Sequence, residues 1–260
     1  MKQRLCLTIL IFALASGAAQ AITIDLLDVN NRILWNTGFA GGTTLGANGA
    51  VDANYLWNGT SAYVFNPTGT PFPASAWNPN KTDTNSPDDY AWINPLQPLP
   101  NGSLPTAPAN VSAFVTTSFA LAPAPNVQSW DVELQGRLWA DNWPGTVELL
   151  DSSNQLISLF TLPTPGTPGS GTNGAIGDRG YASSYLGNFA LVATGHAPGT
   201  YTIRFEVFNL PGATSNPAGL QVNWTRGLAY GIVPEPGSIF LMGAIGGALF
   251  LLNRRRSKSA

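Results

Sequence analysis

Apolar residues alternate with polar ones along three stretches of the chain, and this pattern predicts β-strands. The apolar members are Trp130, Val132, Leu134, Gly136 and Leu138 in the first stretch, Tyr201, Ile203, Phe205 and Val207 in the second, and Leu220, Val222 and Trp224 in the third. Asp131, Glu133, Gln135 and Arg137 fall on the opposite face of the first stretch. A period of two gives each strand one buried and one solvated face, which is typical of antiparallel sheets.

A turn-forming tetrapeptide, residues 151–154, separates two further apolar segments, 146–150 and 155–162, and this order predicts a β-hairpin. Additional strands are expected at 23–29, 62–65 and 112–121. Long connections rich in Pro, Gly and Asn interrupt the strands at 66–110 and 163–180. Together these features predict an all-β fold, an antiparallel β-sandwich of jelly-roll or Greek-key type with long loops.

The N-terminus has the three parts of a secretion signal. Lys2 and Arg4 provide a short basic region, residues 5–15 an apolar region, and Ala19-Gln20-Ala21 a small-x-small cleavage motif. We expect signal peptidase to cut after Ala21, so that the mature chain begins at Ile22. The alternative is an uncleaved membrane anchor.

The C-terminus carries a second apolar segment with basic residues after it. The triplet Pro234-Glu235-Pro236 precedes an uncharged run over 237–252, and Arg254, Arg255 and Arg256 follow. As a helix the run would span about 24 Å, a little less than a hydrocarbon core of about 30 Å. Arginines favour the cytoplasmic side, so the rest of the chain is expected outside the cytoplasm.

This tail resembles the PEP-CTERM sorting signal, whose three parts are a Pro-Glu-Pro triplet, a short apolar helix and a terminal Arg cluster. Such tails are also labelled the ice-binding protein C-terminal region. The resemblance implies recognition of the triplet by exosortase, a membrane enzyme thought to cut nearby and pass the protein to the cell surface. The chain would then comprise a signal peptide (1–21), an exported β-sandwich domain (22–232) and a sorting signal (233–260). The alternative is a tail-anchored protein that is never processed.

A second resemblance lies within the exported domain. Residues 136–142, with a Gly at their start and Asp141-Asn142 at their end, and the turn at 216–220 are similar to a β-sandwich region common among PEP-CTERM proteins. Leu150-Asp151-Ser152 stands where that region has a Leu-Asn-Gly hairpin. The jelly-roll character of the region is similar to carbohydrate-binding modules.

Composition narrows the functional classes. The single cysteine, Cys6, lies in the signal segment, so the mature chain has neither disulfides nor cysteine metal sites. Between residues 22 and 233 six basic residues face thirteen acidic ones, a net charge of −7. A mildly acidic exported domain is poorly suited to binding nucleic acid.

Groups suited to catalysis are sparse, and we expect no enzyme and no cofactor. His196 is the sole histidine and lies in a turn motif, while the glutamates of the domain occupy alternating strand positions. The most oxygen-rich stretch, with Asp83, Asp88 and Asp89, is a candidate for Ca²⁺, although it lacks the spacing of a calcium-binding loop. No other metal site is expected.

Tryptophans are the remaining candidates for binding, because sugar rings stack their apolar faces on exposed aromatic rings. Trp139, Trp143, Trp77 and Trp92 are the candidate sugar platforms, whereas Trp130 and Trp224 alternate as core residues. The leading hypothesis is a non-enzymatic cell-surface or extracellular-matrix protein that contacts exopolysaccharide. The alternative is a carbohydrate-binding module, and a secreted hydrolase or an ice-binding protein is less well supported.

Overall fold

The computed structural model describes residues 22–28, 30–41, 44–65, 89–98, 111–140, 143–162, 185–209 and 218–233. These residues form thirteen strands. No helix among them is both long and apolar enough to cross a bilayer. The predicted signal peptide and the sorting tail, including Pro234, Glu235, Pro236 and the Arg cluster, lie outside the described residues.

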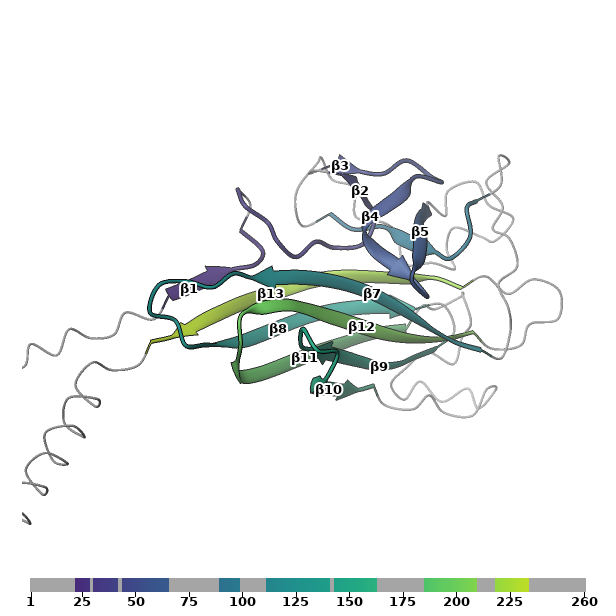
Figure 1. Ribbon diagram of the computed structural model, residues 1–260. Coiled ribbons are helices and arrows are strands. Elements are labelled where there is room, and N and C mark those ends of the chain that lie inside the picture. The colour runs from purple at the N-terminus through teal and green to yellow at the C-terminus, as the bar shows by residue number, and fades with distance from the viewer. Residues whose placement is uncertain are drawn as a thin grey trace, which may run out of the picture.

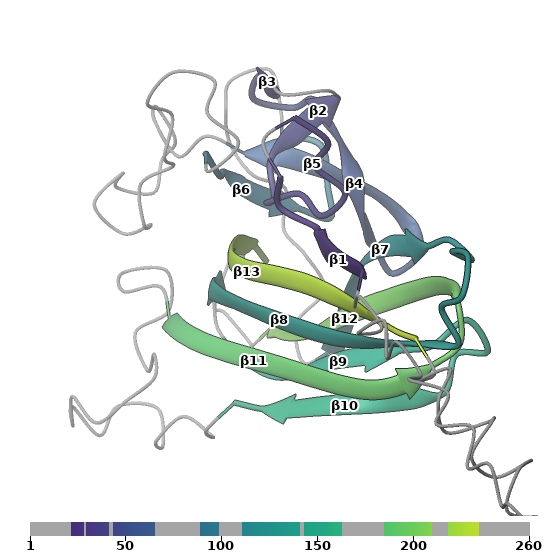
Figure 2. The same ribbon diagram turned by 90° about the vertical axis from the view of Figure 1, so that its left-hand side faces the viewer.

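The main sheet has eleven strands and is antiparallel throughout. One half contains β10 (Leu156–Thr161), β9 (Trp143–Leu150), β12 (Gly199–Asn209) and β7 (Val111–Leu121), in that order. The other contains β11 (Tyr185–His196), β8 (Ser129–Ala140) and β13 (Leu220–Ile232), with β1 (Ile22–Asp25) paired to β13. The two halves lie face to face as two layers (Figures 1 and 2).

Three shorter strands join the layers along one side. β4 (Val51–Trp57) pairs with β7, β5 (Thr60–Phe65) with β4, and β6 (Trp92–Asn94) pairs with both β5 and β13. A small sheet of β2 (Phe39–Gly41) and β3 (Thr44–Leu45) lies beside them, above the main layers (Figure 2). Strands β2 to β6 therefore cover one side of the layered structure (Figures 1 and 2).

The space between the layers is filled by the inward residues of the alternating strands. All the apolar members predicted for β8, β12 and β13 are buried. Phe205 of β12 meets Phe189 of β11 at 5.7 Å and Trp224 of β13 at 6.0 Å between ring centroids, which shows the two layers in direct contact. Burying each such side chain contributes about 1.5–3 kcal/mol, and burial of this kind stabilises a domain without disulfides.

The edge of β13 that faces away from β8 is covered along its length. β1 pairs with residues 228–231, β6 pairs with Leu220, and Asn36 and Thr37 fill the interval between them. The Thr37 hydroxyl accepts a hydrogen bond from the Val222 backbone N–H at 2.9 Å, and the Asn36 side-chain oxygen accepts one from the Trp224 N–H at 2.8 Å. This cover protects an edge that could otherwise pair with another chain.

The prediction of an all-β antiparallel fold is confirmed, as is the hairpin of β9 and β10. The predicted alternation is wrong at one position of β13. Gln221 was expected in solvent because it alternates with Leu220 and Val222, but it is fully buried. Gln221 is the cross-strand partner of Trp139, which is buried against Phe65 and Trp92, so this part of the outer face is covered. Among the longer strands, β4 and β11 were not predicted, nor were the short strands β2, β3 and β6.

Candidate functional site

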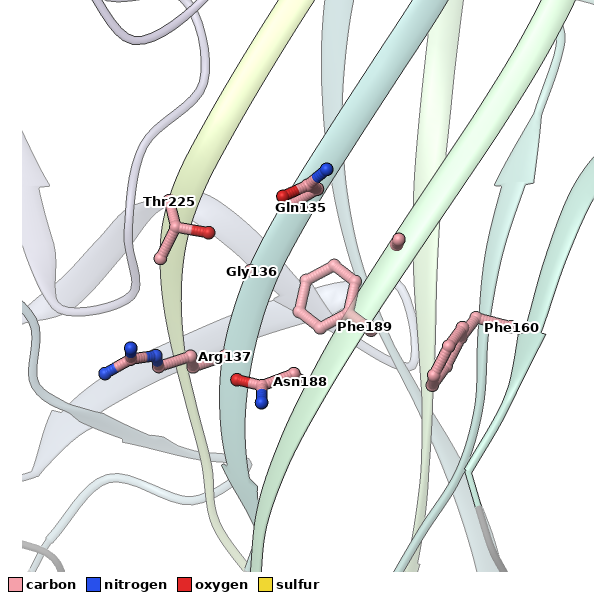
Figure 3. A pocket seen from close by; sticks show the side chains of 8 residues that line it. Gln135, Gly136, Arg137, Phe160, Asn188, Phe189 and Thr225 are labelled. Atoms are coloured by element: carbon pink, nitrogen blue, oxygen red, sulfur yellow. The ribbon is translucent and has the colours of Figure 1, made fainter.

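A hollow of about 460 Å³ lies on the layer formed by β11, β8 and β13, bounded by Phe160 of β10 (Figure 3). Its walls combine an exposed guanidinium, two exposed side-chain amides, a hydroxyl and aromatic carbon. The lining residues are Gln135, Gly136, Arg137, Phe160, Asn188, Phe189, Ala190 and Thr225. Polar groups converging over an apolar floor are typical of small-molecule and sugar sites.

Strand register brings these polar side chains together. Arg137 of β8 is directly opposite Asn188 of β11, and Gln135 is opposite Ala190. Cross-strand partners share a face with their Cβ atoms about 5 Å apart, and residues two apart on one strand also share that face. Gln135, Arg137 and Asn188 are all exposed, so the three side chains project from the outer face of the layer.

The floor of the hollow depends on Gly136. A Cβ at this position would lie 2.6 Å from Cζ of Phe189 and 3.0 Å from the backbone oxygen of Asn223. The missing side chain leaves room for the Phe189 ring, which packs edge-on against Trp224 at a centroid distance of 5.1 Å. The Phe189 ring is thereby packed into the core beneath the polar rim, with 2% of its surface exposed.

A β-bulge places the hydroxyl of the site. The register between β13 and β8 shifts between Trp224 and Arg226, so Thr225 is the extra residue. Thr225 and Arg226 are both exposed, which interrupts the alternation of β13. Bulges redirect side chains in this way and are frequent beside functional sites.

The polar groups of the hollow are available to a ligand. The side chains of Gln135, Arg137, Asn188 and Thr225 form no hydrogen bond or ion pair with any other residue that the structure describes. The neighbouring Arg226 differs, because both its Nε and its Nη2 donate to Glu133, at 3.0 and 2.9 Å. Within the described part of the chain, the donors and acceptors of the hollow thus have no protein partner.

The outer face of the opposite layer is a second polar cluster, but its groups satisfy one another. The Arg204 guanidinium contacts the Glu148 carboxylate at 2.5 Å and lies 4.6 Å above the Phe114 ring. The Thr146 hydroxyl lies 3.4 Å from carboxylate oxygens of both Glu148 and Glu206. Internal pairing of this kind stabilises the strands and leaves few groups free for a ligand.

Two of the predicted sugar platforms are not at the surface. Trp92 is fully buried and Trp139 is 7% exposed, stacked on Tyr90 at a ring-centroid distance of 5.3 Å. Both belong to a small apolar cluster with Phe65, beneath the strands that join the layers. A ring must be exposed to stack on a sugar, so the prediction for Trp92 and Trp139 is wrong.

The other candidates lie wholly or partly outside the described residues. Trp77, Asp83 and Asp88 are not described, and of Trp143 only the backbone is, where it pairs with Phe208. Asp89 is buried at 1% exposure. No group of three or more metal-ligating side chains occurs within the described part of the chain. His196 is half-buried at the end of β11.

Sequence reasoning found one side of the hollow and missed the other. Alternation placed Gln135 and Arg137 on the outer face of β8, as observed. Asn188 was missed because β11 was not predicted, although Phe189, Leu191 and Ala193 alternate there as buried residues. That alternation was the available signal.

Comparison with known proteins finds low sequence identity and low structural similarity. No family model matches the chain, and no curated protein matches it. Among solved structures, the N-terminal cellulose-binding domain of β-1,4-glucanase C from Cellulomonas fimi has 10% identity and a TM-score of 0.31, over 70% of this chain and 90% of that one. A mutant of a carbohydrate binding module family 29 has 10% identity and a TM-score of 0.27, over 84% and 99% of the two chains.

Proposed function

We propose that this protein binds carbohydrate through the hollow on β8, β11 and β13. The observation that supports this most directly is the set of unpaired side chains, Gln135, Arg137, Asn188 and Thr225, beside the half-buried ring of Phe160. A sugar ring presents hydroxyls at its rim and C–H groups on its faces. Amides and a guanidinium match the first, and the half-buried ring of Phe160 matches the second.

The size and rigidity of the site also suit a saccharide. A volume of about 460 Å³ falls within the range of sites that hold small ligands. The three polar strand positions are fixed by sheet register, so little backbone freedom is lost when a ligand binds. The described lining of the site contains no pair of carboxylates, which sugar hydrolysis would require. The lining therefore supports ligand binding as the function of the hollow.

We further propose that this binding takes place outside the cytoplasm, at the cell surface or in the extracellular matrix. The support is the predicted secretion signal at residues 1–21 and the tail at 233–260, which resembles a PEP-CTERM signal. An exosortase substrate that binds sugar would attach to exopolysaccharide or to glycans of neighbouring cells. This combines the matrix hypothesis with the carbohydrate-binding alternative.

Retention on polysaccharides tests the binding proposal. Full-length protein kept in detergent is passed over immobilised cellulose, xylan, mannan, β-1,3-glucan and alginate. The double variant Gln135→Ala/Asn188→Ala should lose at least about tenfold in retention on the best-bound polymer, because two hydrogen bonds of about 1 kcal/mol each disappear.

The matched control is Ser118→Ala/Thr202→Ala, a cross-strand polar pair on the outer face of the opposite layer. This control should bind as the wild type does, and both double variants should melt within a few degrees of it. The proposal fails if no polymer is retained, or if both double variants bind equally well.

A further inference from the structure

We infer that the ligand of the hollow is an anionic saccharide, one that carries carboxylate or sulfate groups. This inference rests on the proposed carbohydrate-binding function and specifies its substrate class. The juxtaposition that carries it is one unpaired arginine, Arg137, flanked by the neutral donors Gln135 and Asn188.

Arg137 is the only charged residue among the described residues that line the hollow. The nearest acidic residue on its own strand face is Glu133, four positions along β8 and hence about 13 Å away. Glu133 is already paired with Arg226. The next one, Asp131, accepts a hydrogen bond from the Gly195 backbone N–H at 2.7 Å. Within the described part of the fold, therefore, no carboxylate on this strand neutralises Arg137.

The guanidinium is also the right chemical group for this ligand. Its planar fork donates two parallel hydrogen bonds to a carboxylate or sulfate, and such charge-assisted bonds are about twice as strong as neutral ones. The amides of Gln135 and Asn188 can donate to the remaining oxygens or to ring hydroxyls. A neutral sugar would leave the charge of Arg137 without a counter-ion.

Because the domain as a whole is negatively charged, we expect an anionic saccharide to bind at one specific site rather than over the whole surface. Between residues 22 and 233 the net charge is −7, so the domain repels polyanions in general. A polyanion that binds must therefore find a specific site of opposite charge. The hollow is such a site on the outer face of its layer.

The test compares acidic polysaccharides with their own carboxyl-reduced forms, in which each uronic acid has become a neutral sugar with the same linkages. The probes are alginate, polygalacturonate and xanthan, each spotted in both forms on an array. The full-length protein carries Gln in place of Arg254, Arg255 and Arg256 in every sample, so that the basic tail does not bind polyanions itself. Wild-type binding should favour the acidic forms, and raising the salt should weaken that preference.

Substitution of the arginine then assigns the preference to the hollow. Arg137→Gln should reduce binding to the preferred acidic polymer by at least about tenfold and leave binding to its reduced form unchanged. Arg137→Lys should retain part of the preference. Arg226→Gln, the same change at an exposed arginine of the same layer that already has a partner, should bind as the wild type does.

The possible outcomes separate this inference from the proposed function. Equal binding of acidic and reduced polymers by the wild type overturns the inference and leaves carbohydrate binding intact. A preference that survives in Arg137→Gln also overturns it, because another group must then read the charge. Failure to bind any polymer on the array in either form contradicts both proposals.

Discussion

Gly136 is the residue on which the architecture of the hollow depends. Its strand neighbours face outward or inward by ordinary alternation, but its own missing side chain is what admits the Phe189 ring beneath the rim. Phe189 in turn contacts both Phe205 and Trp224, so the floor is continuous with the core. A change at this one position should therefore affect stability and binding together.

Gly136→Ala should destabilise the domain by about 1–3 kcal/mol, as overpacking in a well-filled core does. The new Cβ would meet Phe189 and the backbone oxygen of Asn223, and that backbone cannot rotate away as a side chain can. Urea unfolding followed by circular dichroism measures the loss. The matched control is Gly145→Ala on β9, where the new Cβ would meet the flexible side chain of Glu206. Equal stability of wild type and Gly136→Ala would contradict this account of the floor.

At the scale of elements, the bulge in β13 and the covered edge of the same strand mark the limit of prediction from sequence. Alternation identifies which residues of β8, β12 and β13 enter the core, because burial requires apolar side chains there. It does not reveal that Thr225 is inserted or that Asn36 and Thr37 lie along β13, since both depend on partners distant in sequence. The buried Trp92 and Trp139 were misassigned for the same reason.

Asp52 of β4 provides a second link between distant segments. Its carboxylate accepts hydrogen bonds from the backbone N–H groups of Gly38 at 2.5 Å, Asn54 at 2.8 Å and Tyr55 at 3.0 Å, and the side chain is 2% exposed. Burial raises the pKa of Asp52 to about 7, since loss of solvation outweighs the backbone hydrogen bonds that favour the charged form. The connection between β2 and β4 thus depends on the ionisation state of one buried group.

This raised pKa predicts how stability depends on pH. Because the pKa in the folded state exceeds the unfolded value of 3.8, Asp52 binds its proton more tightly when folded. The contribution of Asp52 to the free energy of unfolding is full below about pH 4, falls as the pH rises towards 7, and changes little above that. If the pKa is raised by about three units, the stability lost over this range is on the order of 4 kcal/mol.

Urea unfolding at pH 5 and pH 8 measures this contribution, with wild type more stable at pH 5. In Asp52→Asn the amide nitrogen would meet backbone N–H donors, so this variant should be less stable at pH 5 but should lose the difference between the two pH values. A wild type equally stable at both, or a variant that retains the full difference, would refute the assignment to Asp52.

For the whole molecule, the pairing of the first strand with the last is the feature that relates the domain to the two predicted terminal signals. Ile22 of β1 is opposite Gly231 of β13, which is itself opposite Trp130 of β8. The chain therefore enters and leaves the domain at the same end of the paired strands. Arg137 lies seven residues further along β8, or about 23 Å away. The hollow is thus well separated from the point where the tail begins.

The tail itself should determine where the protein ends up. Pro234, Glu235 and Pro236 form the triplet predicted to be recognised by exosortase. Replacing both prolines and Glu235 by Ala should leave full-length protein in the inner membrane, as should deletion of the cognate exosortase. Mass spectrometry of surface-released wild-type protein should find no Arg cluster. An intact Ala260 terminus in that fraction would be incompatible with sorting.

The most direct test of the central claim is to locate a bound saccharide on the protein. Oligosaccharides cut from the best-retained polymer are titrated into ¹⁵N-labelled full-length protein in detergent, and backbone amide shifts are followed by NMR. Carbohydrate binding in the hollow predicts that the largest shifts fall at 135–137, 188–190 and 225, while Phe114, Arg204 and Glu206 on the opposite layer stay unchanged. Shifts concentrated on that opposite layer at saturation would contradict the claim.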